Sequence, residues 1–319
     1  MIIYLEKKYK NNNIAKNIIS FYKGAKILEI DNYKNIFDKN LAGNTEKSII
    51  IAGVNNAITK VPPFYGNPGV GYFFKNSLNC IYDCSYCYLK GAFKNDTQVF
   101  FVNYEEIKEQ ILETVKDKSN FYRFYSSDYS DNLATDSMTK FTEEFIPFFE
   151  TLDNANMEIR TKSTNLKNLL SLTNIPKNTE IAFSLNPSEV IEKYEFKTPK
   201  LDERIKAINT MCDAGFLVGI RFQPLLEIEN YQEIYTKFLE YLVPKINFSK
   251  INSIFVGGLM YTYDDYNKML QKNPYLDLLY KLKKDKDLFY RESDDVRKWF
   301  YQIFDKYLKG CECNRCMDR

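Results

Sequence analysis

The segment SLNCIYDCSYCYLKGAF, residues 77–93, places three cysteines close together in the order Cys80-x3-Cys84-x2-Cys87. Three thiolates at this spacing can hold one face of a cubane iron–sulfur cluster and leave the fourth iron open to a chelating molecule. A zinc knuckle is the alternative, but a structural zinc site takes four protein ligands and the chain has no histidine to complete one. Because the whole chain has only seven cysteines, chance is a poor explanation of this grouping. The segment therefore predicts an iron–sulfur cluster with an open iron.

The cysteine segment overlaps the end of the first of several expected strands that alternate with helical patterns. These strands are predicted at residues 71–79, 121–127, 157–162, 179–185, 217–223 and 251–258. The clearest helical pattern between them has its N-cap at Asn103. Its apolar face is expected to hold Ile107, Ile111, Leu112 and Val115. Strands separated by helices predict an α/β fold, with a parallel sheet that is either open or closed into a partial barrel.

The organisation of the chain suggests an N-terminal α/β cap, a run of strands and helices, and a helical extension with a cysteine-rich tail, at residues 1–70, 71–260 and 261–319. The Pro/Gly-rich residues 61–71 predict a boundary loop after the cap. Residues 281–287 are strongly charged and predict a solvated helix face. An aromatic-containing helix is expected at residues 294–308, just before the tail.

Composition limits the classes of function. The chain has 319 residues, of which 45% are hydrophobic and 27% charged, so extensive disorder is excluded. A net charge of +2 offers no electrostatic argument for a nucleic-acid partner. The absence of histidine excludes histidine general bases and histidine-ligated zinc. Since no apolar run has the length of a membrane span and the N-terminus lacks a signal-peptide pattern, we expect a cytoplasmic protein with no membrane partner.

The cysteine segment resembles the signature of the radical S-adenosylmethionine superfamily, including an aromatic residue, Tyr86, directly before the last cysteine. In that superfamily the three cysteines hold a [4Fe–4S] cluster whose open iron chelates S-adenosylmethionine. One electron from the cluster cleaves the sulfonium, and the resulting 5′-deoxyadenosyl radical abstracts hydrogen. The resemblance implies both cofactors and a reducing partner of the flavodoxin or ferredoxin type.

Within that superfamily, CSYCYLKG resembles the spore photoproduct lyase family, whose members repair a thymine dimer in DNA. Further segments agree in the same order, namely IIYLEKKY, SIIIAGV, VNYEEIKEQ, RFYSSDYSD, IRTKS, FSLNPSEVI and LDERIKA. This similarity runs from the N-terminus to about residue 225. It implies a partial (β/α)6 TIM-type barrel with a small N-terminal α/β cap and a helical, cysteine-rich C-terminal extension.

The resemblance also places cofactor-binding roles on residues that follow the expected strands. The matching positions are Tyr86, Ser130, Lys162, Ser184 and Asn186. Ligands of a barrel bind at the carboxyl ends of its strands, which agrees with the position of Ser130, Lys162 and Ser184. Taken singly, a surface role is the ordinary alternative for a serine or lysine. Tyr88 matches a family tyrosine near the radical path, and among 25 tyrosines a packing role is an equal alternative.

Two departures from the family concern the reaction. The catalytic cysteine, which returns hydrogen to the product radical, aligns with Asp128, and the family's C-terminal DNA-engaging hairpin is not recognisable. A carboxylate cannot readily donate a hydrogen atom, but it can accept a proton, bind a cationic group or ligate a metal. Cys212 is a poor substitute, because its segment predicts the end of a helix, where a buried, inert thiol is expected. We therefore assign Asp128 and Tyr88 to the catalytic site and expect Asp128 to contact substrate.

A second group of cysteines, Cys311, Cys313 and Cys316, lies in the tail GCECNRCMDR. One interpretation is a second metal centre, most naturally an auxiliary iron–sulfur cluster, with Cys212 or a non-protein ligand in the fourth position. The alternative is a frayed tail whose thiols bind zinc adventitiously or bind nothing.

The leading hypothesis is a radical S-adenosylmethionine enzyme, similar to spore photoproduct lyase, that starts its reaction by hydrogen abstraction. Repair of a DNA base lesion is the first substrate class by resemblance. Modification of a peptide or small metabolite is the alternative favoured by the missing cysteine and the near-neutral charge. A non-catalytic iron–sulfur or zinc protein that binds nucleic acid is a third hypothesis, and the retained cysteines with Lys162 and Ser184 argue against it.

Overall fold

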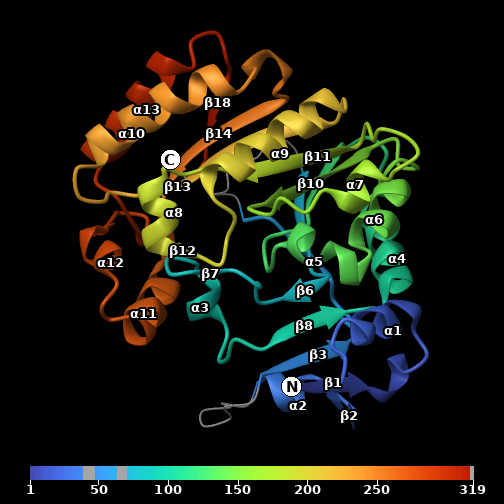
Figure 1. Cartoon of the computed structure of the whole chain (residues 1–319). Coiled ribbons are helices and arrows are strands. Elements are labelled where there is room, and N and C mark those ends of the chain that lie inside the picture. The colour runs from blue at the N-terminus through green and yellow to red at the C-terminus, as the bar shows by residue number, and fades with distance from the viewer. Residues whose placement is uncertain (39–46, 63–69, 317–319) are drawn as a thin grey trace.

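The centre of the molecule is a curled sheet that forms a partial barrel, seen in a computed structural model that describes residues 1–38, 47–62 and 70–316 (Figure 1). The sheet has eight strands in the order β18-β14-β13-β11-β10-β9-β5-β4. All neighbours are parallel except β4 and β5. The strands span Ile58–Lys60 (β4), Val70–Phe74 (β5), Tyr122–Tyr125 (β9), Ala155–Thr161 (β10), Thr179–Ser184 (β11), Leu217–Leu225 (β13), Ser253–Gly258 (β14) and Cys313–Arg315 (β18). The expected partial α/β barrel is confirmed.

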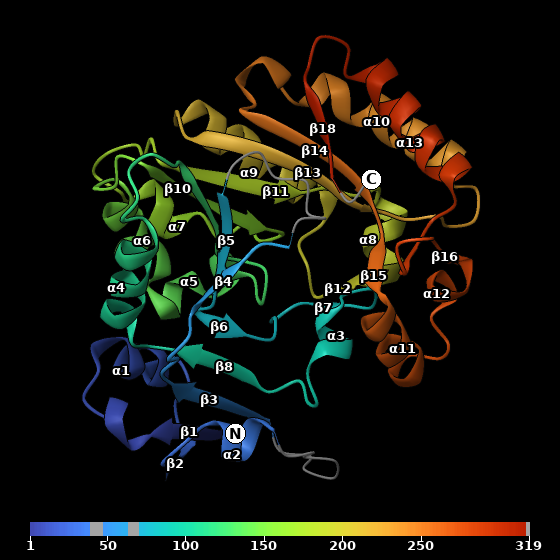
Figure 2. The ribbon, with the colours of Figure 1, turned by 180° about the vertical axis from the view of Figure 1, so that it is seen from behind.

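Helices cover the outer face of this sheet (Figures 1 and 2). They are α4 (Tyr104–Thr114), α5 (Asn132–Thr139), α6 (Phe141–Phe149), α7 (Lys167–Leu170), α8 (Ser188–Tyr194), α9 (Leu201–Asp213), α10 (Tyr231–Leu242) and α13 (Asp294–Tyr307). Successive strand residues point to opposite faces, so Met157 and Ile159 of β10 join the apolar core under the helices. Glu158 and Arg160 of the same strand face the barrel interior, which is therefore polar.

An ion-pair network fills this interior and links four strands. The carboxylate of Glu158 accepts hydrogen bonds from Arg221 Nη2 at 2.7 Å and Arg160 Nη2 at 3.0 Å. Arg123 bridges Glu158 and Glu180, and Arg221 bridges the same two carboxylates. Burial by itself raises the pKa of Glu158, but the surrounding guanidinium groups outweigh it and hold that pKa below its usual range.

A second sheet, of five strands in the order β2-β1-β3-β8-β6, forms the N-terminal part. Its strands are Ile2–Glu6 (β1), Lys26–Ile30 (β2), Ser48–Ala52 (β3), Ser77–Leu78 (β6) and Gln98–Phe101 (β8), and helices α1 (Asn13–Ser20) and α2 (Lys34–Phe37) connect its first strands. The prediction of one continuous strand over residues 71–79 is wrong, because this segment contributes β5 to the barrel and β6 to the second sheet. The chain leaves the barrel after Phe74, and β6 pairs with β8 instead. Most of the predicted boundary loop, residues 63–69, lies outside the described residues.

The expected helix after Asn103 is present as α4 with Asn103 at its N-cap position, but its side chain does not cap the helix and its buried face is narrower than predicted. The Asn103 side chain makes no cap; its amide bonds the backbone N–H and C=O of Val54, at 2.9 and 3.0 Å, and so ties the helix start to the N-terminal sheet. The buried stripe consists of Ile107, Ile111 and Val115. Leu112 is 47% exposed, because it follows Ile111 by about 100° around the helix axis.

The C-terminal extension contains a small sheet as well as helices. Helix α11 (Tyr263–Lys272) and helix α12 (Asp277–Lys281) accompany strands β15 (Met260–Thr262), β16 (Lys283–Lys284) and β17 (Phe289–Arg291). The prediction of a solvated helix face at residues 281–287 is wrong. The Asp285 side chain accepts the backbone N–H groups of Asp287 and Phe289 and so stabilises a turn in this segment. The aromatic-containing helix is confirmed as α13. No helix within the described ranges combines the length and apolarity that crossing a bilayer requires.

We expect Glu158→Gln to lower the free energy of unfolding by about 3 kcal/mol, because it leaves the buried guanidinium of Arg221 without one of its counter-charges. The depressed pKa means that Glu158 stabilises the fold fully above its unfolded pKa, and that this contribution is lost as the pH falls through the folded pKa. Urea unfolding at pH 7 and in mild acid measures both effects. Glu233→Gln, which breaks an exposed pair with Lys237, is the control, and an equal loss in both variants would contradict the argument.

Candidate functional site

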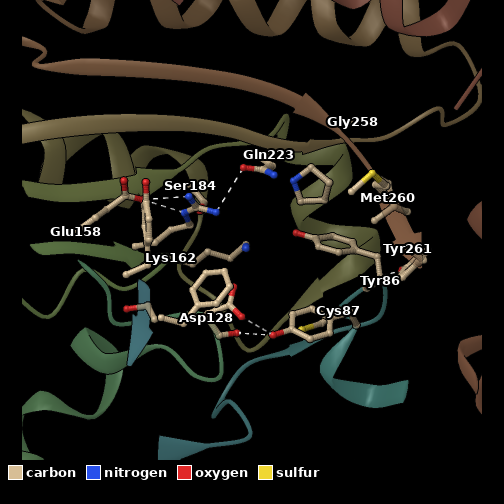
Figure 3. A pocket seen from close by; sticks show the side chains of 17 residues that line it. Tyr86, Cys87, Asp128, Glu158, Lys162, Ser184, Gln223, Gly258, Met260 and Tyr261 are labelled. Carbon is tan, nitrogen blue, oxygen red and sulfur yellow. Dashed lines mark hydrogen bonds and ion pairs between the residues drawn. The ribbon is translucent and has the colours of Figure 1, made fainter. Parts of the chain in front are cut away.

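The carboxyl ends of the barrel strands surround a cavity of about 200 Å³ (Figure 3). The strand ends, the cysteine segment and the β14–β15 connection all contribute to its wall. A smaller cavity of about 120 Å³ adjoins it on the side of the cysteines. The residues that line both cavities are Tyr86, Cys87, Ser127, Asp128, Arg160, Lys162 and Ser184. One connected polar site therefore lies where barrel enzymes bind their ligands.

Cys80, Cys84 and Cys87 all line the smaller cavity. The segment is held in place by strand β7 (Asp83–Cys84), which pairs with β12 (Glu195–Phe196), and by the short helix α3 (Leu89–Ala92) that follows. Burial raises the pKa of each thiol, that of Cys84 to about 12, and the nearby ammonium of Lys162 opposes the rise for Cys84 and Cys87. The thiols are thus protonated at neutral pH unless a metal displaces their protons.

The arrangement of these thiols fits a cluster better than a single ion. Among the described residues, no three His, Cys, Asp or Glu side chains converge closely enough to hold one metal ion. The three cysteines nevertheless face the same small cavity. An iron–sulfur cubane separates its cysteine ligands over different iron atoms, and therefore suits thiols that share a cavity without meeting at a point.

The ammonium of Lys162 points into the site beside Tyr86, 5.8 Å from the centre of its ring (Figure 3). Burial by itself lowers the pKa of Lys162, but the carboxylate of Glu195 opposes it, so the pKa is raised and the side chain stays cationic. Glu195 also accepts hydrogen bonds from the Tyr86 hydroxyl, from Asn186 at 2.9 Å and from Arg204 at 2.6 Å. A fully enclosed carboxylate thus fixes the wall on which Tyr86 and Lys162 lie.

Asn186, expected among the cofactor-binding residues, lies behind this wall. It is fully buried, bonds Glu195 and Tyr235, and lines neither cavity. Glu195 was missed from the sequence, because a two-residue strand carries no periodic signal.

Hydroxyl groups face the same space. Ser184 lines both cavities and Ser130 lines the smaller one, as the sequence predicts for cofactor-binding residues. The Oγ atoms of Ser130 and Ser127 are buried and have no hydrogen-bond partner within the described part of the chain. Buried hydroxyls normally find partners, so these two suit a polar ligand in the cavity. Ser127 was missed, although it lies in the segment RFYSSDYSD.

Two further residues that the sequence analysis missed position this wall. Asp131 is the N-cap of α5 and accepts the backbone N–H of Lys162 and the hydroxyl of Thr161, each at 2.8 Å. Arg160 lines both cavities and pairs with Glu158. Its position was detectable, since residues two apart on a strand share a face and Arg160 precedes Lys162 by two.

Asp128 and Tyr88, which the sequence analysis assigns to the catalytic site, lie in direct contact. The Tyr88 hydroxyl donates to the Asp128 carboxylate at 2.8 Å and lies 3.0 Å from its backbone oxygen. Both residues line the larger cavity, and Asp128 lines the smaller one as well. The pair connects the cysteine segment to the end of β9, with a carboxylate that can receive a proton from the phenol or from a ligand.

The tail cysteines are ordered but are not all brought together. Strand β18 pairs with β14, so residues 313–316 are not a frayed end. Cys316 is 5% exposed and fills the space beside Gly257, where a Cβ would lie 2.7 Å from its Sγ. Burial raises its pKa to about 11, and Arg160 and Arg221 of the barrel interior oppose that rise. Cys311 instead neighbours Cys313, near Asp305 of α13.

Cys212 lies on α9, as predicted, but its thiol is only partly buried. The charged groups near it are Lys250 and Asp213. It is therefore not placed to complete a site with the tail.

Comparison with known proteins identifies the relatives of this fold and site. The family model described as spore photoproduct lyase matches residues 2–292. The chain is 25% identical to the spore photoproduct lyase of Bacillus subtilis (strain 168), over 76% of this chain and 72% of that protein. It is 22% identical to that of Geobacillus sp. (strain Y412MC61), over 77% and 73%. A solved spore photoproduct lyase mutant with bound AdoMet and dinucleoside spore photoproduct has the same fold, with a TM-score of 0.82 and 20% identity over 98% of this chain and 97% of that one.

We expect iodoacetamide at pH 8 to modify Cys311 much faster than Cys316 in the folded, metal-free protein. The thiolate is the reactive form, and both burial and the raised pKa of Cys316 suppress it. Mass spectrometry of tryptic peptides measures the two rates, and unfolding in urea should make them alike. Similar rates in the folded protein would mean that β18 does not stay docked on β14.

Proposed function

The chain belongs to the spore photoproduct lyase family of radical S-adenosylmethionine enzymes, and we propose that Cys80, Cys84 and Cys87 hold a [4Fe–4S] cluster beside a bound S-adenosylmethionine. The observation that carries this proposal is the convergence of the three thiols, the Lys162 ammonium and two unpartnered serine hydroxyls on connected cavities. When bound and reduced by one electron, these cofactors supply a 5′-deoxyadenosyl radical that abstracts hydrogen.

Different residues of the site would bind different groups of S-adenosylmethionine. Lys162 is cationic and faces the cavity, so it suits the carboxylate of the methionyl group. Ser130, Ser127 and Ser184 offer hydroxyls to the amine or the ribose. Asp131 accepts the backbone N–H of Lys162, and Glu195 accepts the hydroxyl of Tyr86, so the two carboxylates fix the wall beside the cavity from behind. The enclosing barrel wall limits the access of water to a reactive intermediate.

The tail cysteines give no reason to propose a second cluster. A second cluster on Cys311, Cys313 and Cys316 would require Cys316 to leave its place beside Gly257 in the barrel. We therefore propose a single cluster, held by the segment at residues 80–87.

Repair of a DNA base lesion is the first substrate class, because the family acts on a DNA photoproduct. Asp128 argues against assigning the complete reaction of the family to this chain. It lines the cavity where, by resemblance, the family has its hydrogen-returning cysteine, and a carboxylate has no hydrogen atom to return. The pairing of Asp128 with Tyr88 favours a substrate with a cationic or proton-donating group next to the reacting carbon. A modified peptide or small metabolite fits this requirement and is the second candidate.

We expect the anaerobically reconstituted, dithionite-reduced protein to hold about four iron atoms per chain and to convert S-adenosylmethionine into 5′-deoxyadenosine. The Cys80→Ala/Cys84→Ala/Cys87→Ala variant should lose both iron and product. Cys311→Ser/Cys313→Ser is the matched control and should retain both. Lys162→Met should keep the iron but weaken S-adenosylmethionine binding by roughly 10- to 100-fold, through loss of one charge-assisted contact. Product formation by the triple variant would refute the assignment.

We expect the unmodified protein to release little or no thymine from the dinucleotide spore photoproduct, because Asp128 cannot supply the closing hydrogen atom. Asp128→Cys should increase thymine release if the rest of the site accepts that substrate, and Asp128→Ala is the control for a simple loss of charge. Thymine is measured by chromatography against 5′-deoxyadenosine in the same samples. Efficient multiple-turnover repair by the unmodified chain would show that Asp128 does not mark a change of reaction.

A further inference from the structure

A second hollow, of about 830 Å³, approaches the cysteine segment from outside the barrel. Cys80, Cys84 and Cys87 line it, together with residues of the N-terminal sheet and of the 94–98 segment. None of its described lining residues comes from a barrel strand. The cysteine segment therefore separates the catalytic cavities from a hollow that is open to another molecule.

Lysines predominate among the charged groups of this hollow. Four of its lining residues are lysines, Lys47, Lys90, Lys94 and Lys197, against two aspartates, Asp83 and Asp96. Asp83 pairs with both Lys90 and Lys197, and the four lysines and two aspartates together leave a net charge of +2 on this surface. The chain as a whole carries 44 basic and 42 acidic side chains, so this two-to-one ratio is a local excess of positive charge.

Exposed Ile81 lines this hollow, and exposed Phe196 lies beside it. Ile81, between the first two cysteines, is 43% exposed, and Phe196 is 49% exposed. Phe196 pairs directly with Asp83 across the β7–β12 ladder. Directly paired residues of an antiparallel ladder project to the same side, so Phe196 adjoins the hollow that Asp83 lines. Exposed apolar groups within a charged rim are typical of protein docking sites.

We propose that this surface, formed by Ile81, Phe196, Lys47, Lys90, Lys94 and Lys197, docks an acidic one-electron carrier protein of the flavodoxin or ferredoxin type. The proposal rests on the proposed function, since only a cluster on these cysteines needs an electron from outside. Electron transfer slows steeply with distance, and this surface touches the cluster-binding thiols while leaving the barrel side free for cofactor and substrate. Positive charge here would attract and orient an acidic partner.

The electron balance of the docked step is simple. The reduced carrier donates one electron and is itself oxidised by one electron. A cluster held by Cys80, Cys84 and Cys87 would pass that electron to the sulfonium of bound S-adenosylmethionine, and cleavage of one C–S bond would give methionine and the 5′-deoxyadenosyl radical.

The first test compares two reductants on the same variants. Lys94→Glu/Lys197→Glu should raise the apparent KM for reduced bacterial flavodoxin roughly tenfold in 5′-deoxyadenosine formation, and should leave the dithionite-driven rate unchanged. With the unmodified protein that KM should rise with added salt, because exposed charges are screened. Lys206→Glu/Lys298→Glu, two exposed lysines on α9 and α13, is the matched control.

The outcomes separate the two proposals. An unchanged flavodoxin KM in Lys94→Glu/Lys197→Glu would overturn the docking surface while the proposed function stands. No product from the unmodified protein with either reductant would instead refute the proposed function. A raised KM for a DNA substrate with an unchanged KM for flavodoxin would show that the lysines bind nucleic acid, and would also overturn the docking surface.

A second measurement needs no variant and no turnover. Acetylation of the unmodified protein with and without excess oxidised flavodoxin should show protection of Lys94 and Lys197 but not of Lys206. Equal labelling of all three lysines at a saturating flavodoxin concentration would overturn the proposal.

Discussion

The ion-pair network of the barrel interior is the constraint on which the rest of the molecule depends. Glu158 and Glu180 share the guanidinium groups of Arg123 and Arg221 across β9, β10, β11 and β13, and thereby join the inner faces of four strands. Arg160 extends this network to the wall of the catalytic cavity. Charges so deeply buried are tolerable only when every one is paired, so the network permits little displacement of the strands that carry the site.

Buried carboxylates also support the residues that we propose to bind the cofactor. Asp131 holds the backbone of Lys162, and Glu195 holds the hydroxyl of Tyr86 and the charge of Lys162. Each supporting carboxylate is buried and bonded to several donors, which keeps it in one orientation. The site is therefore rigid where it would grip a cofactor. Asp128 and Tyr88 form a separate hydrogen-bonded pair that lines the larger cavity, where we propose that substrate binds.

The two sides of the cysteine segment face different environments. On the barrel side its thiols meet a positively charged lysine and a row of hydroxyls, and on the other side they meet a lysine-rich hollow next to the N-terminal sheet. This arrangement exists because the chain leaves the barrel after β5, pairs briefly as β6 in the second sheet, and returns through the cysteine segment. The N-terminal sheet thus takes part in shaping one side of the site and does more than cover the barrel.

The sequence by itself determined the features that are encoded locally. The spacing of Cys80, Cys84 and Cys87, the βα alternation and the strand-end positions of Lys162 and Ser184 depend on neighbours in the chain. The barrel and these five cavity-lining residues were therefore predictable. Tertiary structure alone decided the rest. Asn186 lies behind the cavity wall, Glu195 anchors that wall, and Cys316 packs into the barrel away from Cys311. In each case the outcome depends on packing against elements distant in the chain, and no short pattern of residues records such contacts.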